Sequence, residues 1–296
     1  MNIFVTGGSG FLGSRIVEEL LKHGCTTSFS TRPKDFSARL SGATPTFGDL
    51  KALTSKDFEG FDAVIHSAAL TPGPHEEAKY KEVNGEGTRH LVEACVKAGV
   101  KRFVHISTMA VAADRNDPYA TSKREAERHV RASALDWTII RPGAVYGLSD
   151  WWVSYLRLMK KKSLVPVIGD GEYFIHQIYV KDCARGIVRV ASEETNGGKI
   201  YNAAAAPITY NHYLSVLRAS LGADFKPIHI PMWVGHVYAA GMKHVFRSPK
   251  PQYSHDPRRD VATGSATTLD CGPRIFELGL AEMLSELSSE DVSSRP

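Results

Sequence analysis

Residues 2–13, NIFVTGGSGFLG, decide how this chain folds. Residues 3–5 are an apolar run typical of a buried strand, and the glycine-rich stretch 6–10 predicts a tight turn. From Phe11 the apolar spacing becomes helical and continues until Gly24. A strand, a glycine turn and a helix in this order predict a phosphate cradle. Without side chains an anion can approach the backbone, and the helix N-terminus offers free N–H groups and a partial positive charge.

The glycine spacing agrees with that interpretation. Gly8-x-Gly10-x-x-Gly13 has the spacing of a dinucleotide-binding turn, and it lies between an expected strand and an expected helix. A glycine pattern alone is weak evidence, because glycine turns are common. With the strand and the helix on the correct sides, we expect a dinucleotide site.

Strand-like and helix-like segments alternate through the first half of the chain. This alternation predicts an α/β fold, namely a Rossmann-type doubly wound parallel sheet with a smaller C-terminal substrate-binding region. We expect the parallel set to close with the strand at 137–140. The expected strands are 3–5, 26–31, 44–47, 62–65, 101–106 and 137–140, and the later expected helices are 86–98, 119–132, 152–162, 180–192, 209–221 and 232–246.

The same pattern suggests three regions. Residues 1–147 are expected to form the dinucleotide-binding core, including the helix with the candidate catalytic residues. Residues 148–284 are expected to be mainly substrate-binding and interleaved with the core. Residues 285–296 are rich in serine and acidic side chains, so we expect a flexible tail.

Composition narrows the function classes. The 296 residues are 43% hydrophobic and 23% charged, and the net charge is only +4 with scattered basic residues, so we expect no nucleic-acid partner. The four cysteines are far apart and form no CxxC, which favours reduced thiols and no metal site. The first strand leaves no room for a signal peptide, and polar residues interrupt the apolar stretch 228–246. We therefore expect a cytoplasmic protein without a membrane span.

The end of the second expected strand bears on cofactor choice. In this fold an acidic residue there favours NAD through the ribose 2′-hydroxyl. Here the position reads Ser30-Thr31-Arg32, without a carboxylate, and Lys34 is close by. A guanidinium at this place can pair with a 2′-phosphate, so we expect NADP(H) in preference to NAD(H). The alternative is that Arg32 is a solvated loop charge.

Asp49 and Leu50 follow the third expected strand. A carboxylate there can accept a hydrogen bond from the adenine amino group while Leu50 packs on the ring. A simple surface turn explains the same two residues nearly as well.

The segment Asp117–Lys123, DPYATSK, carries the chemistry. Asp117 is a suitable N-cap and Pro118 a suitable first helical residue, so Tyr119 and Lys123 are expected one turn apart on the same helix face. An ammonium beside a phenol favours the phenolate and lowers the phenol pKa. That permits proton exchange with a substrate hydroxyl or carbonyl at neutral pH.

Together these motifs resemble the extended short-chain dehydrogenases/reductases, a family marked by a glycine turn and a Tyr-x-x-x-Lys pair. The resemblance extends over most of the chain, and the motifs come in the family's order. The matching segments are TGGSGFLG (6–13), DL (49–50), HSAA (66–69), VNGEGT (83–88), ST (107–108), YATSK (119–123) and RPGAVYG (141–147).

The resemblance implies roles for individual residues. Thr108 takes the hydroxyl position that hydrogen-bonds the reacting oxygen, with Ser107 as the adjacent candidate. Tyr119 is the acid/base, and Lys123 both holds the nicotinamide ribose and tunes the phenol. Asn84 is implied to lie near the cofactor and a proton-relay water. The implied cofactor-binding residues are Gly7, Ser9, Gly10, Phe11, Leu12, Gly13, Arg32, Asp49, Leu50, Ala68, Asn84, Tyr119, Lys123 and Pro142.

The reaction within this family is narrowed by one departure. Nucleotide-sugar epimerases and dehydratases usually carry an arginine after a GDG-like turn, and here Ile175 occupies that position after Gly169–Gly171. The sequence therefore favours an oxidoreductase that interconverts a secondary alcohol and a ketone, similar to 3β-hydroxysteroid dehydrogenases and dihydroflavonol reductases. The alternatives are a nucleotide-sugar epimerase or dehydratase that retains its cofactor, and a non-catalytic nucleotide-binding subunit or sensor.

Two expectations concern partners. Aromatic residues in the C-terminal half are candidates to surround an apolar ring substrate, although each of them is equally well explained as a core residue. By analogy with similar proteins, the helices expected at 86–98 and 119–132 suggest a homodimer. The aromatic candidates are Trp151, Trp152, Tyr155, Trp233, Tyr238 and Phe246.

Overall fold

A computed structural model describes most of the chain, in two compact units. Tyr238 and Phe246, two of the aromatic residues considered for a ring substrate, and most of the helix expected at 232–246 lie outside the described residues. The described residues are 1–35, 40–112, 117–193, 197–234 and 267–293.

The two units do not divide the chain at a single point. Unit 1 contains residues 1–143, Val180–Ala203 and Ala262–Gly272, and unit 2 contains Ala144–Tyr179, Ala204–Val261 and Pro273–Pro296. The expected boundary after residue 147 thus falls just inside unit 2. The chain returns to unit 1 because two later strands join the central sheet and a later helix packs against it.

Unit 1 is a Rossmann-like α/β structure built on an eight-stranded parallel sheet. The strand order reverses between β1 and β4, which places the loops that follow these two strands side by side at a topological switch point. In sheet order the strands are β14 (Thr267–Thr268), β11 (Lys199–Ala203), β6 (Asp136–Pro142), β5 (Arg102–Ile106), β4 (Ala63–His66), β1 (Asn2–Thr6), β2 (Thr26–Thr31) and β3 (Thr44–Phe47).

The expectation that the strand at 137–140 closes the parallel set was wrong. β11 pairs with β6, and β14 pairs with β11. Local periodicity did not reveal these neighbours, because each partner is reached only after a long excursion of the chain and β14 spans only two residues.

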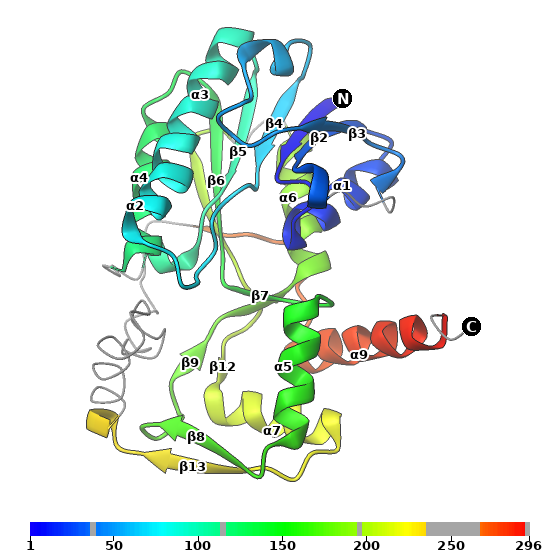
Figure 1. Ribbon diagram of the computed structural model, residues 1–296, viewed down its shortest axis with the longest axis vertical. Coiled ribbons are helices and arrows are strands. Elements are labelled where there is room, and N and C mark those ends of the chain that lie inside the picture. Colours follow the sequence, from blue (N-terminus) through cyan, green and yellow to red (C-terminus); the bar gives the residue numbers. More distant parts are fainter. Residues whose placement is uncertain (36–39, 113–116, 194–196, 235–266, 294–296) are drawn as a thin grey trace. The chain divides into compact units, whose positions relative to one another are not determined.

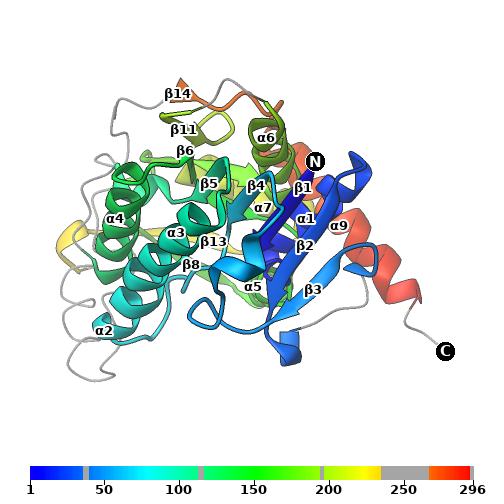
Figure 2. The same cartoon turned by 90° about the horizontal axis from the view of Figure 1, so that it is seen from above.

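Helices cover both faces of this sheet (Figures 1 and 2). α1 and α6 pack against each other on one face, and α3 and α4 lie on the other, so the sheet is doubly wound. A single π-helical segment, η4, leads into α3. The helix bounds are α1 (Phe11–Lys22), α2 (Glu77–Tyr80), η4 (Lys81–Glu86), α3 (Gly87–Ala98), α4 (Pro118–Arg131) and α6 (Val180–Ser192), with short 3-10 turns η1 (Pro33–Asp35), η3 (Ser55–Phe58) and η5 (Met109–Val111).

The core of unit 1 joins the sheet to α3 and α4. Phe4 from β1 and Phe103 from β5 share one cluster with Leu91 of α3 and Val130 of α4. The ring of Phe58 meets Phe4 edge-on, with the centroids 5.0 Å apart. Burying each such side chain contributes roughly 1.5–3 kcal/mol, so these contacts fix α3 and α4 on the sheet.

In its described residues, unit 2 combines helices with three two-stranded sheets. The turn Gly169–Gly171 has two glycines with positive φ, +76° and +71°, and the Asn211 side chain donates to the Asp170 carbonyl oxygen beneath it at 2.9 Å. Ile175 follows in β9. The elements are β7 (Ala144–Tyr146), α5 (Asp150–Lys161), β8 (Leu164–Ile168), β9 (Phe174–Ile175), β10 (Gln177–Tyr179), β12 (Ile208–Thr209), α7 (Tyr210–Leu221), β13 (Lys226–Ile230) and α9 (Phe276–Ser293).

The C-terminal segment differs from the expected flexible tail. Residues 285–293 continue α9, whose first turns bury Phe276, Leu280 and Met283. The Tyr179 hydroxyl also donates to the Glu286 carboxylate at 2.9 Å. These tertiary contacts support a helix that the serine-rich composition alone did not predict.

No helix in the described ranges is both long enough and apolar enough to cross a bilayer.

Candidate functional site

The loop after β1 forms a tight cradle at the carboxyl end of this central strand. Gly7 has φ +66°, and a Cβ placed on it would lie 2.8 Å from the Cα of Ala68 in the loop after β4. A Cβ on Gly13 would lie 2.1 Å from the carbonyl oxygen of Gly7, so α1 sits directly on the turn. Within the described chain no side chain caps this helix at Gly10, which leaves the N–H groups of Phe11, Leu12 and Gly13 for an anion, since the Ser14 N–H already donates to the Gly10 carbonyl.

Hydroxyl groups attach this turn to β2. Ser30 accepts from the Gly7 N–H at 3.0 Å, and the Thr31 hydroxyl donates to Ser9 Oγ at 2.8 Å. The Arg32 side chain is 62% exposed and pairs through Nε with the Asp35 carboxylate. The strand end itself has no carboxylate, as expected, but a carboxylate three residues later engages the arginine.

Asp49 and Leu50 lie in the loop after β3. The Asp49 carboxylate accepts from the backbone N–H groups of Lys51 and Ala52 at 3.0 and 3.1 Å, so one of its oxygens shapes the turn. Leu50 packs against the start of α3, where its Cδ1 would lie 3.3 Å from a Cβ on Gly87. The adenine contact expected of these two residues stays a prediction.

His66 connects the loops that follow β1 and β4. Thr88 donates its hydroxyl proton to the Asn84 carbonyl at 2.6 Å, so it accepts from His66 Nε2–H, 2.9 Å away. His66 Nδ1 then accepts from the Thr6 hydroxyl at 2.7 Å, and Thr6 Oγ1 accepts from the Ala68 N–H at 3.2 Å. The network is satisfied with a neutral imidazole protonated on Nε2.

Burial keeps this histidine and its neighbour neutral. His66 and His105 are paired across β4 and β5, and their ring centroids are 5.2 Å apart. Desolvation first, and the nearby Lys123 ammonium second, hold the pKa of each imidazole well below its usual range. Neither histidine therefore adds positive charge beside Lys123 at neutral pH.

Asn84 lies in the π-helical segment and is buried. Its side-chain oxygen accepts from the Leu70 N–H at 2.7 Å, and its Nδ2 donates to the Leu70 carbonyl at 3.1 Å and to Ser122 Oγ at 3.0 Å. Ser122 in turn donates to the Tyr119 carbonyl at 2.8 Å. Asn84 thereby ties the loop after β4 to the first turn of α4.

Tyr119 lies at the second position of α4. The helix begins as expected, because the Asp117 side chain accepts from the Ala120 N–H at 3.0 Å and a proline fills the first position. The Tyr119 ring meets Tyr80 edge-on, with centroids 6.1 Å apart. The Tyr80 hydroxyl is bound to the backbone of Gly73, at 2.9 Å from its N–H. Tyr80 is therefore a fixed apolar wall for the Tyr119 ring.

Lys123 lies one turn further along α4 and is only 2% exposed. Its Nζ donates to the Ile106 carbonyl at 2.6 Å, at the end of β5. Burial lowers the pKa of Lys123 to about 8, against the opposing effect of the Glu127 carboxylate. An ammonium whose pKa lies close to neutral pH suits a group that adjusts the proton affinity of a neighbouring phenol.

The two hydroxyl candidates after β5 differ in their partners. Ser107 is buried and donates to Glu127 Oε1 at 2.6 Å. Thr108 is half-buried, and its Oγ1 accepts a long hydrogen bond, 3.3 Å, from the Ala110 N–H. Ser107 thus donates to a buried carboxylate, whereas the Thr108 hydroxyl has no acceptor for its proton among the described residues. Pro142, at the end of β6, is buried and paired in register with Ala203 of β11.

The described candidate substrate-binding aromatic residues belong to unit 2, whereas all the candidate catalytic and cofactor-binding residues expected from the sequence belong to unit 1. Sequence reasoning missed the groups that hold them in place, namely His66, Tyr80, Glu127 and Arg141. The sequence did contain a signal for Glu127. Tyr119, Lys123 and Glu127 follow one another at intervals of four residues, which places all three on one face of a helix.

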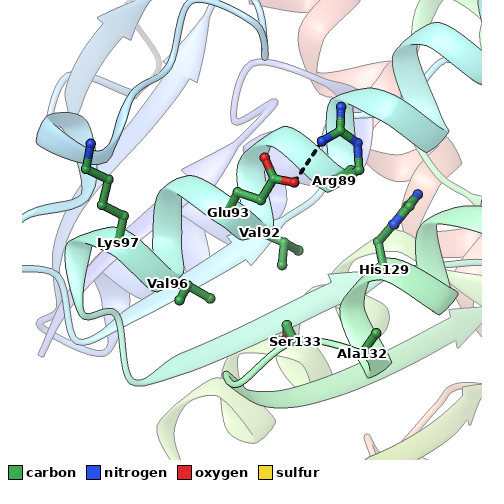
Figure 3. Close-up of a pocket in the computed structure, with 8 residues that line it drawn as sticks. All are labelled: Arg89, Val92, Glu93, Val96, Lys97, His129, Ala132 and Ser133. Atoms are coloured by element: carbon green, nitrogen blue, oxygen red, sulfur yellow. Dashed lines mark hydrogen bonds and ion pairs between the residues drawn. The ribbon is translucent and has the colours of Figure 1, made fainter.

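A separate hollow lies on the outer surface of α3 and α4 (Figure 3). It has a volume of about 410 Å³, and its apolar part is lined by Val92, Val96 and Ala132. Arg89 and Glu93 form an ion pair at its rim, 2.7 Å apart. None of the candidate catalytic residues lines this hollow.

Comparisons with known proteins agree with this architecture. The model of the NAD dependent epimerase/dehydratase family matches residues 3–204. A 4-hydroxy-2-methyl-3-oxo-4-farnesyl-3,4-dihydroquinoline-1-oxide ketoreductase of Stigmatella aurantiaca is 27% identical, over 95% of this chain and 92% of that protein. The human decarboxylating sterol-4-alpha-carboxylate 3-dehydrogenase is 26% identical, over 78% of this chain and 69% of that protein. Among solved structures, UDP-glucose 4-epimerase from Thermotoga maritima with UDP-glucose superposes with a TM-score of 0.73 at 22% identity, covering 98% of this chain and 99% of that one.

Proposed function

Because the chain belongs to the NAD dependent epimerase/dehydratase family, we propose that it is an NAD(P)-dependent oxidoreductase that interconverts a secondary alcohol and a ketone. The observation that carries this proposal is the pair on α4, where Tyr119 is followed one turn later by the buried Lys123. A buried ammonium one turn from a tyrosine is an arrangement for moving a proton at neutral pH.

The residues of unit 1 fit a dinucleotide. The turn at Gly7 and the uncapped start of α1 would hold the pyrophosphate, since a Cβ on Gly7 or on Gly13 would meet the backbone. Ala68 borders this turn, and Asn84 and Lys123 would lie toward the nicotinamide end. When bound, the nicotinamide supplies or accepts the hydride at the substrate carbon.

The chain's own residues supply the rest of the reaction. Tyr119 donates a proton to the carbonyl oxygen in the reducing direction, and accepts it from the alcohol in the oxidising direction. Lys123 stabilises the phenolate that remains after donation, by charge and from a water-poor position. Thr108 donates a hydrogen bond to the same substrate oxygen.

The two neighbouring hydroxyls give a matched test. Thr108→Val removes the donor and keeps the branched shape, so kcat should fall by about 10²-fold, as when one oxyanion donor is lost. Ser107→Ala instead removes a hydrogen bond to a buried carboxylate and should lower the free energy of unfolding by about 1–3 kcal/mol. Steady-state kinetics and urea unfolding of both variants check this assignment. An equal loss of kcat in the two variants would contradict it.

The proposed substrate is an apolar carbonyl compound, and a ring compound is favoured. The position where a nucleotide-sugar enzyme of the resembled family usually has an arginine is Ile175 of β9. Its strand partner, Ile208, is also apolar. The relatives from Stigmatella aurantiaca and human, a farnesyl-dihydroquinoline-oxide ketoreductase and a sterol carboxylate dehydrogenase, support this class.

A substrate panel tests the proposal against its main alternative. Wild-type protein is incubated with NADPH or NADH and with apolar ring ketones, and in parallel with UDP-glucose. Consumption of the reduced cofactor with ketones is the expected result. Conversion of UDP-glucose, with dinucleotide that survives purification, would instead favour an epimerase or dehydratase, the alternative that the structural likeness to UDP-glucose 4-epimerase keeps open. No conversion of either class would favour a non-catalytic nucleotide-binding subunit or sensor.

Within this proposal NADP(H) is favoured over NAD(H), because β2 ends without a carboxylate and Arg32 is exposed there. Arg32→Ala should weaken NADPH binding by roughly 10–100-fold, the value of a charge-assisted hydrogen bond, and leave NADH nearly unchanged. Asp35→Ala is the matched control, since it releases Arg32 from its ion pair and should tighten NADPH. Fluorescence titration measures both, and equal losses for the two cofactors in Arg32→Ala would contradict phosphate recognition.

Two further parts of the proposal concern context. A homodimer through α3 and α4 is supported by the apolar lining of the hollow in Figure 3, where Val96 is 45% exposed. A cytoplasmic location is supported by four cysteines that all remain free thiols.

A further inference from the structure

A fully buried carboxylate lies beneath the candidate catalytic pair. Glu127 has no exposed side-chain surface. Arg141 binds it in a bidentate manner, with Nε 2.8 Å from Oε1 and Nη2 2.6 Å from Oε2, and Ser107 adds a hydrogen bond to Oε1 at 2.6 Å. The partly exposed Arg131 side chain also approaches this carboxylate, with its Nη2 3.6 Å from Oε2. The carboxylate is therefore held by partners from α4, β5 and β6 at once.

Stability alone explains this group poorly. Removing two charges from water costs several kcal/mol per ion, and apolar residues of similar volume often stabilise a core equally well or better. The Glu127 partners Ser107 and Arg141 lie at the carboxyl ends of β5 and β6, where the proposed site is, and not in the apolar cluster around Phe4 and Phe103. From the position of the Glu127–Arg141 ion pair we infer that it has a role in the site.

The surroundings of Lys123 show what that role is. From α4 it is accompanied by Tyr119 and Glu127, from β4 by His66 and from β5 by His105; Arg141 on β6 neutralises the same carboxylate. Both imidazoles are neutral. Glu127 is thus the fixed negative charge on the same helix face, one turn from the ammonium.

The same contacts set the geometry of β5. Three consecutive residues at the end of β5 and just after it each make a contact in the site. The Ile106 carbonyl accepts a hydrogen bond from Lys123, and the Ser107 hydroxyl donates one to Glu127. Thr108 follows as the proposed hydrogen-bond donor to the substrate. A shift of the carboxylate would move Ser107 and thereby both of its neighbours. Glu127 consequently links the position of Lys123 to that of Thr108.

We propose that Glu127, clamped by Arg141 and Ser107, is a positioning residue that supplies the fixed counter-charge for Lys123 and the register of the β5 end. This inference rests on the proposed function only where it predicts an effect on kcat. The charge state of Lys123 can be measured without any substrate.

The test follows Lys123 directly. The protein is labelled with ¹³C-lysine, the Lys123 Cε resonance is assigned by its absence in Lys123→Arg, and its chemical shift is titrated with pH. In Glu127→Gln the midpoint should fall by roughly 1 pH unit, since an opposite charge nearby favours the ammonium. In Arg141→Gln, which breaks the same ion pair but keeps the carboxylate, the midpoint should not fall. An unchanged midpoint in Glu127→Gln, or an equal fall in both variants, would overturn the inference.

A double variant covers the case in which single variants fail to fold. Glu127→Gln with Arg141→Gln removes both charges of the ion pair, so no buried arginine is left without its carboxylate. This variant should fold and still show the lower midpoint, and a wild-type midpoint would overturn the inference. Where a ketone is turned over, kcat should decline at high pH with a midpoint that matches the Lys123 resonance titration of the same variant, and that midpoint should be lower than in the wild type. The KM for the ketone should stay within about twofold. Absence of turnover in the wild type would count against the proposed function alone, because the resonance titration still decides the role of Glu127.

Discussion

Tyr119→Phe should lower kcat by about 10²–10⁴-fold, the usual contribution of a positioned general acid or base. The substitution removes only the phenolic hydroxyl, and the ring keeps its edge-on contact with Tyr80. Cofactor affinity should therefore stay within about twofold of the wild-type value. Steady-state kinetics and fluorescence titration of the cofactor measure the two quantities separately.

Tyr80→Phe is the matched control for that variant. Its hydroxyl is bound to the backbone of Gly73 and is adjacent to the proposed acid/base without taking part in the reaction. This control should lose some stability and keep most of its kcat. A Tyr119→Phe variant that retains near-normal turnover would refute the assignment of the proton to this residue.

Lys123→Met should remove activity and at the same time stabilise the protein. The pKa of Lys123 is lowered from 10.5 to about 8 by burial, which corresponds to a destabilisation of about 3 kcal/mol at neutral pH. The lost hydrogen bond to Ile106 offsets part of this gain. We expect a net gain of roughly 1–2 kcal/mol at pH 7, with kcat reduced by about 10²-fold or more.

The pH dependence of that stability difference has a defined sign. Below pH 8 the lysine is protonated in both states, so the full cost of the buried ammonium is present. Between about 8 and 10.5 the unfolded chain binds more protons than the folded one, and wild-type stability rises with pH. The difference between Lys123→Met and wild type should therefore shrink across this window. Urea unfolding at several pH values measures it, and a constant difference would contradict a buried ammonium.

Local patterns in the sequence predicted the elements that hold the candidate site. The strand–turn–helix at 2–22 and the capped start of α4 at Asp117 agree with the structure, because each depends on residues close together in the chain. The structure also confirms the α/β doubly wound class, since alternation of strand and helix leaves few other arrangements.

The parts that were missed depend on distant contacts. β11 and β14 extend the sheet through pairings with residues far away in the chain, and α9 replaces an expected tail because its first turns are buried. The Glu127–Arg141 pair joins α4 to β6, and the helical spacing of Glu127 after Lys123 does not show that Arg141 of a later strand is its partner.

The most direct test of the proposed chemistry is deuterium transfer to a ketone that the wild-type protein reduces, from NADPH with deuterium at both C4 positions, measured by mass spectrometry of the product alcohol. With wild-type protein each product molecule should carry one deuterium, and Tyr119→Phe should form this product at least about 10²-fold more slowly. Equal rates of labelled product from the two proteins would contradict proton transfer by Tyr119. Absence of label in the alcohol formed from any ketone, together with conversion of UDP-glucose, would contradict the oxidoreductase function itself.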